Sequence, residues 1–340
     1  MTTVAARRRG RVAGPVALPA VALLLAVAVV ASLKVGGTPM SWAALADGLL
    51  RFSGTESDLV VRHVRLSRTL AGVLAGAGLG VAGAIAQGLT RNPLAGPDTL
   101  GINAGAAFAI VVSMLGLGVA SLGGYVWFAF VGGAVAAVAV YAIGATGRGG
   151  ATPVKLAMAG AAVSALLVSM TWSVALLDHD LFARFRFWII GSLARADLDT
   201  SGQALPFLAV GALIAALLTR RLDALALGDE TARTLGSRPT TVRVVGLIGT
   251  VVLAGTATAL AGPLVFVGLV APHAARLVVG TAHRWVLPLS AMLAAAVVLL
   301  ADVVGRVVIA PEEVQIGVTA AILGGPAFLY LVRTRKVPAL

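Results

Sequence analysis

The chain has 340 residues, of which 59% are hydrophobic and only 12% are charged, and its mean hydropathy is +0.98. Water-soluble domains usually contain about 25% charged residues, and each membrane-crossing helix needs roughly 20 apolar residues, so the composition and length exclude both an ordinary soluble domain and a single-anchor protein. The absence of cysteine excludes disulfide scaffolds and thiolate metal sites. The net charge of +12 would suggest nucleic-acid binding in a soluble protein, but in a membrane protein the positions of the basic residues along the chain matter more.

The first apolar run follows a basic N-terminus. Four arginines between residues 7 and 11 precede an apolar run over residues 15–33, a pattern similar to the charged and hydrophobic regions of a signal peptide. The run is longer than a typical signal-peptide core, and no convincing cleavage site precedes a soluble domain. We therefore predict a retained first transmembrane span; a twin-arginine export signal is a weaker alternative.

Nine further apolar runs follow, separated by glycine, proline and charged turns. They cover residues 66–89, 99–116, 123–144, 154–177, 204–219, 242–261, 263–279, 286–304 and 316–332. The sequence thus predicts an all-α protein with ten transmembrane helices. The longest intervening loops, about 34–64, 178–203 and 220–241, are too short to be separate domains, so residues 1–340 are predicted to form a single transmembrane domain.

The basic residues indicate the orientation of these helices. With the N-terminus in the cytoplasm, most of the 26 lysines and arginines fall on the cytoplasmic side, as the positive-inside rule requires. An even number of spans then places the C-terminus on the same side. We expect a multi-pass membrane protein with both termini in the cytoplasm.

Small residues recur at every fourth position of the second apolar run. Such a stripe allows another helix to approach closely, and packing is the favoured interpretation. The stripe consists of Gly72, Gly76, Gly80, Ala84 and Gly88. A formal dinucleotide-binding pattern over residues 78–83 is rejected, because it lies within an apolar helix and follows no strand.

No residue pattern indicates enzymatic chemistry. None of the lysines, Lys34, Lys155 and Lys336, precedes a serine or threonine, so the phosphate-binding loop of an ATPase is absent and any ATP energy must come from another chain. Adjacent side chains diverge, so the run over residues 178–180 is predicted to be a solvated turn rather than a metal site. We expect no catalytic residue, no metal site and no bound cofactor.

Ionisable residues are almost absent from the apolar runs. The nearest cases, Asp302 and Arg306, lie at the end of a run. Ion-coupled carriers usually keep such groups inside their spans, so the pattern argues against a secondary transporter, although backbone carbonyls could still bind sodium.

A short helix is predicted in the loop over residues 220–241. Gly228 ends the preceding helical pattern. Asp229 and Glu230 suit the positive N-terminal end of a new helix, and Gly236 suits its C-terminal cap. The pattern alone leaves an ordinary surface helix and a partner-docking helix equally open.

Several segments together resemble the FecCD family. They are Arg65–Leu70, the turn Arg91–Pro97, the loop Leu227–Gly236, the run Gly262–His273 and the end Gly317–Pro326. The likeness covers nearly the whole chain in the order and spacing of the family. Ser67 stands where the family often has proline, and Gly305 stands where it often has alanine; neither difference removes a charge.

The resemblance implies a permease subunit of an ATP-driven, binding-protein-dependent importer. It implies ten helices per subunit, a second permease subunit that is identical or related, two ABC ATPase subunits that bind ATP and Mg²⁺, an external substrate-binding protein and an iron-chelate substrate. It also suggests an inverted relation between spans two to five and spans seven to ten. A ferric siderophore is the preferred substrate; haem and cobalamin remain alternatives, and an ion-coupled secondary transporter or a structural scaffold is the competing class.

The resemblance also assigns roles to particular residues. Arg65, Arg68 and Arg306 match the positions that dock the binding protein, with interfacial anchoring by long side chains as the alternative. Ala151, Thr152 and Pro153 match the cytoplasmic gate, although a proline there also simply suits the start of a helix. The residues that match the ATPase-coupling segment are Leu227, Gly228, Asp229, Glu230, Thr231, Ala232, Arg233, Thr234, Leu235 and Gly236.

Overall fold

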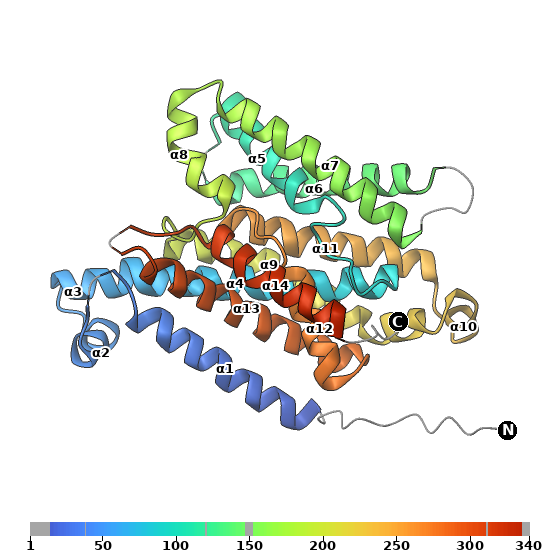
Figure 1. Ribbon diagram of the computed structural model, residues 1–340, viewed down its shortest axis with the longest axis horizontal. Helices are drawn as coiled ribbons and strands as arrows, with labels where there is room; N and C mark the ends of the chain where they lie inside the picture. Colours follow the sequence, from blue (N-terminus) through green and yellow to red (C-terminus); the bar gives the residue numbers. More distant parts are fainter. Residues whose placement is uncertain (1–13, 38, 120, 147–151, 311, 335–340) are drawn as a thin grey trace.

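The computed structural model describes residues 14–37, 39–119, 121–146, 152–310 and 312–334 (Figure 1). Within these ranges the regular elements are all helical. They are α1 (Gly14–Lys34), α2 (Trp42–Leu50), α3 (Glu56–Leu59), the π-helix η1 (Val60–Leu66), α4 (Ser67–Thr90), α5 (Ile102–Leu117), α6 (Leu122–Gly144), α7 (Pro153–Ala175), α8 (His179–Ile190), α9 (Leu198–Ala226), α10 (Asp229–Thr234), α11 (Pro239–Ala261), α12 (Val267–Val279), α13 (His283–Val307) and α14 (Ile316–Thr334).

Seven helices in the described ranges are long and apolar enough to cross a membrane. They are Gly14–Lys34, Glu56–Thr90, Leu122–Gly144, Val154–Ala175, Leu198–Ala226, Pro239–Ala261 and His283–Val307. Three shorter apolar helices, at Ile102–Leu117, Val267–Val279 and Ile316–Ala327, coincide with the other apolar runs of the sequence. Each of the ten predicted runs thus corresponds to a helix, and seven of these meet the length of a full crossing.

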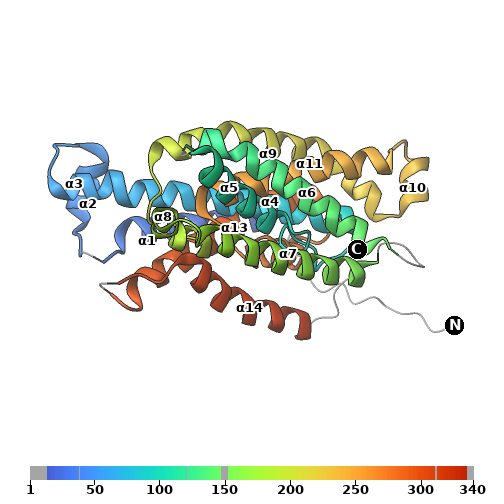
Figure 2. The ribbon, with the colours of Figure 1, turned by 90° about the horizontal axis from the view of Figure 1, so that it is seen from above.

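The long helices run side by side along the long axis of the molecule. α2 and α3 lie at one end and α10 lies at the opposite end; α1 begins and α14 ends in the half of the molecule nearer to α10 (Figure 1). Seen from above, α14 lies along one side of the bundle and α9 and α11 lie along the other (Figure 2). α4 and α11 are largely buried between their neighbours.

The small-residue stripe of α4 faces α13. A Cβ atom on Gly76 would lie 2.6 Å from the Cα of Ala295, and one on Gly80 would lie 2.2 Å from the carbonyl oxygen of Ser290. Real Cβ atoms do not approach other atoms this closely, so the two helices can pack at this distance only with glycine at both positions.

Two of the shorter helices begin at loops that meet inside the bundle. α5 follows the loop over residues 91–101, and α12 follows the loop over residues 262–266. The amide of Asn103 donates to the carbonyl oxygen of Leu264 at 3.4 Å and to the carboxylate of Asp98 at 2.5 Å. Both loops thus leave backbone groups inside the bundle, where side chains supply the hydrogen bonds that a membrane cannot.

The structure differs from the expected boundaries in two loops. The loop expected at about 34–64 contains α2, and α3 and η1 continue directly into α4, so Arg65 and Arg68 lie within one helical segment from Glu56 to Thr90. The loop expected at 178–203 contains α8 and the first turn of α9. These helices are short or only partly apolar, so hydrophobic runs alone do not reveal them.

Candidate functional site

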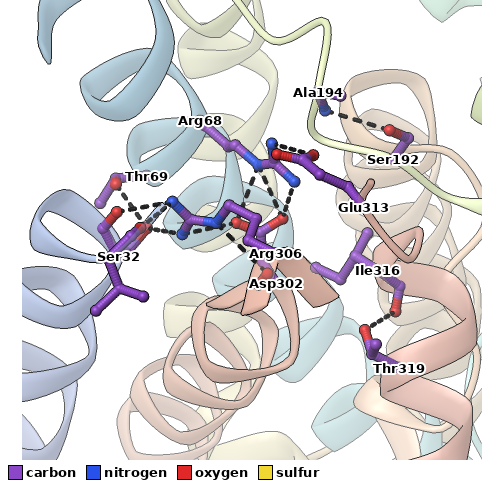
Figure 3. Close-up of polar contacts among 11 residues, drawn as sticks. Ser32, Arg68, Thr69, Ser192, Ala194, Asp302, Arg306, Glu313, Ile316 and Thr319 are labelled. Carbon is purple, nitrogen blue, oxygen red and sulfur yellow. Dashed lines mark hydrogen bonds and ion pairs between the residues drawn. The ribbon is translucent and has the colours of Figure 1, made fainter. Parts of the chain in front are cut away.

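The three predicted docking arginines lie together at the end of the bundle that carries α2 and α3. Arg65 belongs to η1, Arg68 to α4 and Arg306 to α13, and their exposed fractions are 3%, 6% and 3%. Asp302, which is 1% exposed, lies between two of them (Figure 3). Its Oδ1 is 2.8 Å from Nη2 of Arg68, and its Oδ2 is 3.0 Å from Nη2 of Arg306. One buried carboxylate therefore pairs with two guanidinium groups.

Two of the arginines also cap the end of α1. Nη1 of Arg306 donates to the carbonyl oxygens of Ser32, at 3.0 Å, and Val35, at 2.7 Å. Nη1 of Arg65 donates to those of Leu33, at 2.9 Å, and Lys34, at 2.6 Å. The last carbonyls of a helix have no partner within it and carry partial negative charge, so both guanidinium groups are stabilised here.

Arg68 has a second carboxylate partner. Its Nη1 lies 2.7 Å from Oε2 of Glu313, whose side chain is 35% exposed and which belongs to the segment between α13 and α14 (Figure 3). The cluster therefore combines three arginines with two carboxylates and keeps an excess of positive charge. In this chain the guanidinium groups are held by intramolecular contacts, and their role in docking stays a prediction.

The sequence analysis did not identify Asp302 or Glu313 as partners of these arginines. Asp302 and Arg306 are four residues apart, a spacing at which side chains on a helix meet, so that pair was detectable. The contact between Arg68 and Asp302 joins residues 234 positions apart, and nothing in the local sequence indicates it.

The predicted coupling segment forms a helix at the opposite end of the molecule. α10 spans Asp229–Thr234 and follows Gly228, whose φ of 104° is accessible to glycine but strained for other residues. Asp229 pairs with Nη2 of Arg243 at 2.8 Å and Nη2 of Arg91 at 3.1 Å, and the hydrogen bond from Arg243 lowers the pKa of its carboxyl below 3.8. These pairs fix the first turn of α10 against the C-terminal end of α4, which carries Arg91, and the beginning of α11, which carries Arg243.

The surface of this segment combines apolar and charged side chains. Ala232 is buried, which holds α10 against the bundle. Leu227 and Leu235 are 64% and 62% exposed, and Glu230 is exposed between them. An exposed pair of leucines flanking a charged helix can contact a partner that covers them.

A largely buried polar chain joins α9, α13, α12 and α4. Nδ1 of His283 lies 2.6 Å from Oδ1 of Asp223, near the end of α9, and Nε2 of His283 lies 3.5 Å from Nη2 of Arg276 on α12. Arg276 also donates to the side chain of Gln87 and to the carbonyl oxygen of Ala84 on α4. This chain links α4, α9, α12 and α13, and no role was predicted for it from the sequence.

The predicted gate is described only in part. Ala151 lies outside the described residues. Thr152 is the N-cap of α7, where its Oγ1 accepts a hydrogen bond from the backbone N–H of Lys155 at 3.4 Å, and Pro153 occupies the first helical position. This arrangement is the one expected for a helix start, and a gating role stays a prediction. Among the residues that the structure describes, no group of three or more metal-ligating side chains is present.

Comparison with known proteins identifies the family. Residues 24–334 match the FecCD transport family. The chain belongs to this family. It is 43% identical over 324 residues to the ferric enterobactin transport system permease protein FepD of Escherichia coli, covering 94% of this chain and 96% of FepD. It is 41% identical over 310 residues to the probable siderophore transport system permease protein YfiZ of Bacillus subtilis, covering 91% and 93% of the two chains.

A solved structure supports the same assignment. A metal-chelate type ABC transporter in an inward-facing conformation matches this fold with a TM-score of 0.79 and 26% sequence identity, over 94% of this chain and all of the other. The family and the apolar helices identify this FecCD protein as a multi-pass inner-membrane transport permease.

Proposed function

We propose that this FecCD protein is the permease subunit of an ATP-driven, binding-protein-dependent importer for a ferric siderophore. The observation that carries the proposal is the match over more than nine tenths of the chain to permeases named for enterobactin and siderophore transport. In this role the chain provides the route across the membrane and performs no bond-making chemistry. Haem and cobalamin importers remain the alternative within the same class.

The proposed topology has ten spans with both termini in the cytoplasm. The proposal assigns one span to each of the seven long apolar helices and one to each of the three shorter ones. α1 begins and α14 ends in the half of the molecule nearer to α10, which is consistent with termini on the same side as a cytoplasmic α10 (Figure 1). The basic residues favour the same orientation.

The proposed assembly contains a second permease subunit, identical or related, two ABC ATPase subunits and an external binding protein. ATP and Mg²⁺ would bind to the ATPase subunits. α10, with its flanking residues Leu227 to Gly236, is the segment that would contact the ATPase, because it projects from the bundle and exposes two leucines. The start of α7, including residues 151–153, would form the cytoplasmic gate.

The outer cluster is the proposed docking site of the binding protein. Arg65, Arg68 and Arg306 belong to η1, the first turn of α4 and the last turn of α13. Guanidinium groups are suited to bidentate pairing with carboxylates on a partner. Since these groups are buried in the free chain, docking would require the outer surface to rearrange.

Co-purification tests the assembly. The chain, expressed together with the ABC ATPase of its own transport system, should bind that ATPase in detergent and form a complex whose ATP hydrolysis rises when loaded binding protein is added. Failure of the two to associate, with iron uptake that depends instead on an ion gradient, would favour a secondary transporter.

A further inference from the structure

The two carboxylates that hold Arg68 differ in burial. Asp302 contacts the Nε and Nη2 edge of the guanidinium group and is 1% exposed. Glu313 contacts only Nη1, and its side chain is 35% exposed (Figure 3). A solvent-accessible carboxylate thus occupies the one edge of Arg68 that faces away from the buried pair.

The two ion pairs differ accordingly in how readily they exchange. Breaking a buried pair leaves an uncompensated charge out of water, which keeps Asp302 in place. A pair with one partly exposed member contributes little to stability and is screened by salt. Glu313 is therefore the partner of Arg68 that another carboxylate can replace.

Glu313 lies at a structurally important position in the chain. It is three residues before the start of α14 at Ile316. The backbone N–H of Val314 donates to the carbonyl oxygen of Gly305 at 2.9 Å, and α14 begins against Gly191, whose carbonyl oxygen accepts from Gly317 at 3.2 Å. The preceding residues are exposed, with Val308 at 64% and Ile309 at 50%. The ion pair with Arg68 thus ties the entry of α14 to α4.

We propose that the Nη1 edge of Arg68 is a carboxylate-binding site that Glu313 fills in the free permease. A carboxylate on the surface of the external binding protein replaces Glu313 when the two proteins dock. The exchange releases the segment that leads into α14 from α4. This inference rests on the proposed docking role of the arginine cluster, and it adds to that role the internal carboxylate, Glu313, that the partner displaces.

Two neighbouring glutamates provide a matched comparison. Glu312 is exposed and Glu313 is paired, so E312Q and E313Q remove the same charge from the same loop but only E313Q frees Arg68. The permease and its ATPase, assembled in lipid nanodiscs, are titrated with the loaded binding protein. E313Q should bind it roughly two- to fivefold more tightly than E312Q, the range expected for removing a partly exposed ion pair that competes for Arg68.

A probe in the same loop reports the release directly. Because the chain contains no cysteine, I309C carries a single spin label. In the otherwise wild-type protein the label should become more mobile when the binding protein is added. In E313Q it should already be mobile without the partner, and in E312Q it should behave as in the wild type.

The outcomes separate this inference from the docking role on which it rests. Binding that is independent of salt between about 0.1 and 1 M, where the Debye length falls from about 10 Å to about 3 Å, would overturn electrostatic docking altogether. Salt-dependent binding with equal affinities for E312Q and E313Q, or weaker binding by E313Q, would overturn only the exchange at Arg68. If the ferric chelate alone makes the label mobile, the group that replaces Glu313 belongs to the chelate, and the proposal that a carboxylate of the binding protein replaces it is wrong.

Discussion

The two ends of this FecCD permease use charge in different ways. At the outer end, the arginines and Asp302 are buried and hold α1, α4 and α13 together. At the α10 end, the charges of Asp229, Arg91 and Arg243 are partly exposed and surround a short helix that offers leucines to solvent. The comparison indicates that charge at the arginine end has a structural task even in the isolated chain, whereas the α10 end leaves leucines and Glu230 exposed, as the proposed contact with the ATPase requires.

The largest effect is expected from the carboxylate at the centre of the outer cluster. D302N leaves the buried guanidinium group of Arg306 without its carboxylate partner, while Arg68 keeps Glu313, and it should lower the free energy of unfolding by about 3–5 kcal/mol. The matched control is D47N, because Asp47 is exposed on α2 at the same end. Thermal unfolding in detergent measures both, and equal stability of the two variants would contradict a structural role for the buried pair.

A smaller loss of stability is expected when the polar chain through His283 is broken. H283A removes the contacts to Asp223 and Arg276 and should cost about 1–3 kcal/mol, because Arg276 loses a partner in a buried position, whereas the side chain of Asp223 is 40% exposed and can be hydrated. H63A is the control, since His63 is exposed on η1. Thermal unfolding is again the measurement; if H283A is as stable as H63A, the chain does not hold the four helices together.

The exposed surface of α10 should affect association rather than stability. E230K reverses an exposed charge in the first turn of α10, so the melting temperature should fall only slightly, by the small cost of a cation at a helix N-terminus. Affinity for the ATPase should fall roughly fivefold, equivalent to about 1 kcal/mol, as for a charge reversal at the rim of an interface. E56K reverses an exposed charge at the outer end and should leave ATPase binding unchanged. Equal affinities for the two variants would separate α10 from the ATPase contact.

The smallest effect is expected from the pH dependence of Asp229. Arg243 lowers the pKa of this carboxyl in the folded protein. The stability that the ionised carboxylate contributes is therefore fully present above the unfolded pKa of about 3.9 and is lost as the pH falls through the lower folded pKa. The stability difference between the wild type and D229N should stay constant from pH 7 to about 4, should remain below about 1 kcal/mol, and should disappear at lower pH. A difference that grows on acidification would contradict the assignment.

The sequence predicted the helices better than the contacts between them. The ten apolar runs and the short helix between Gly228 and Gly236 depend on local hydrophobicity and backbone preferences, and each corresponds to a helix in the structure. α8 was missed because its charged residues interrupt the hydrophobic pattern. The contact of Arg68 with Asp302 and Glu313 was missed because it depends on the packing of α4 against α13, which no single segment specifies.

Reconstituted transport tests the central claim most directly. The permease and its ABC ATPase are placed in proteoliposomes, with ATP inside, and the binding protein and a radiolabelled ferric siderophore outside. Our account predicts accumulation of iron that requires both ATP and the binding protein and that persists when ionophores collapse the proton and sodium gradients. Uptake that proceeds without ATP or the binding protein and stops when the gradients collapse would contradict it.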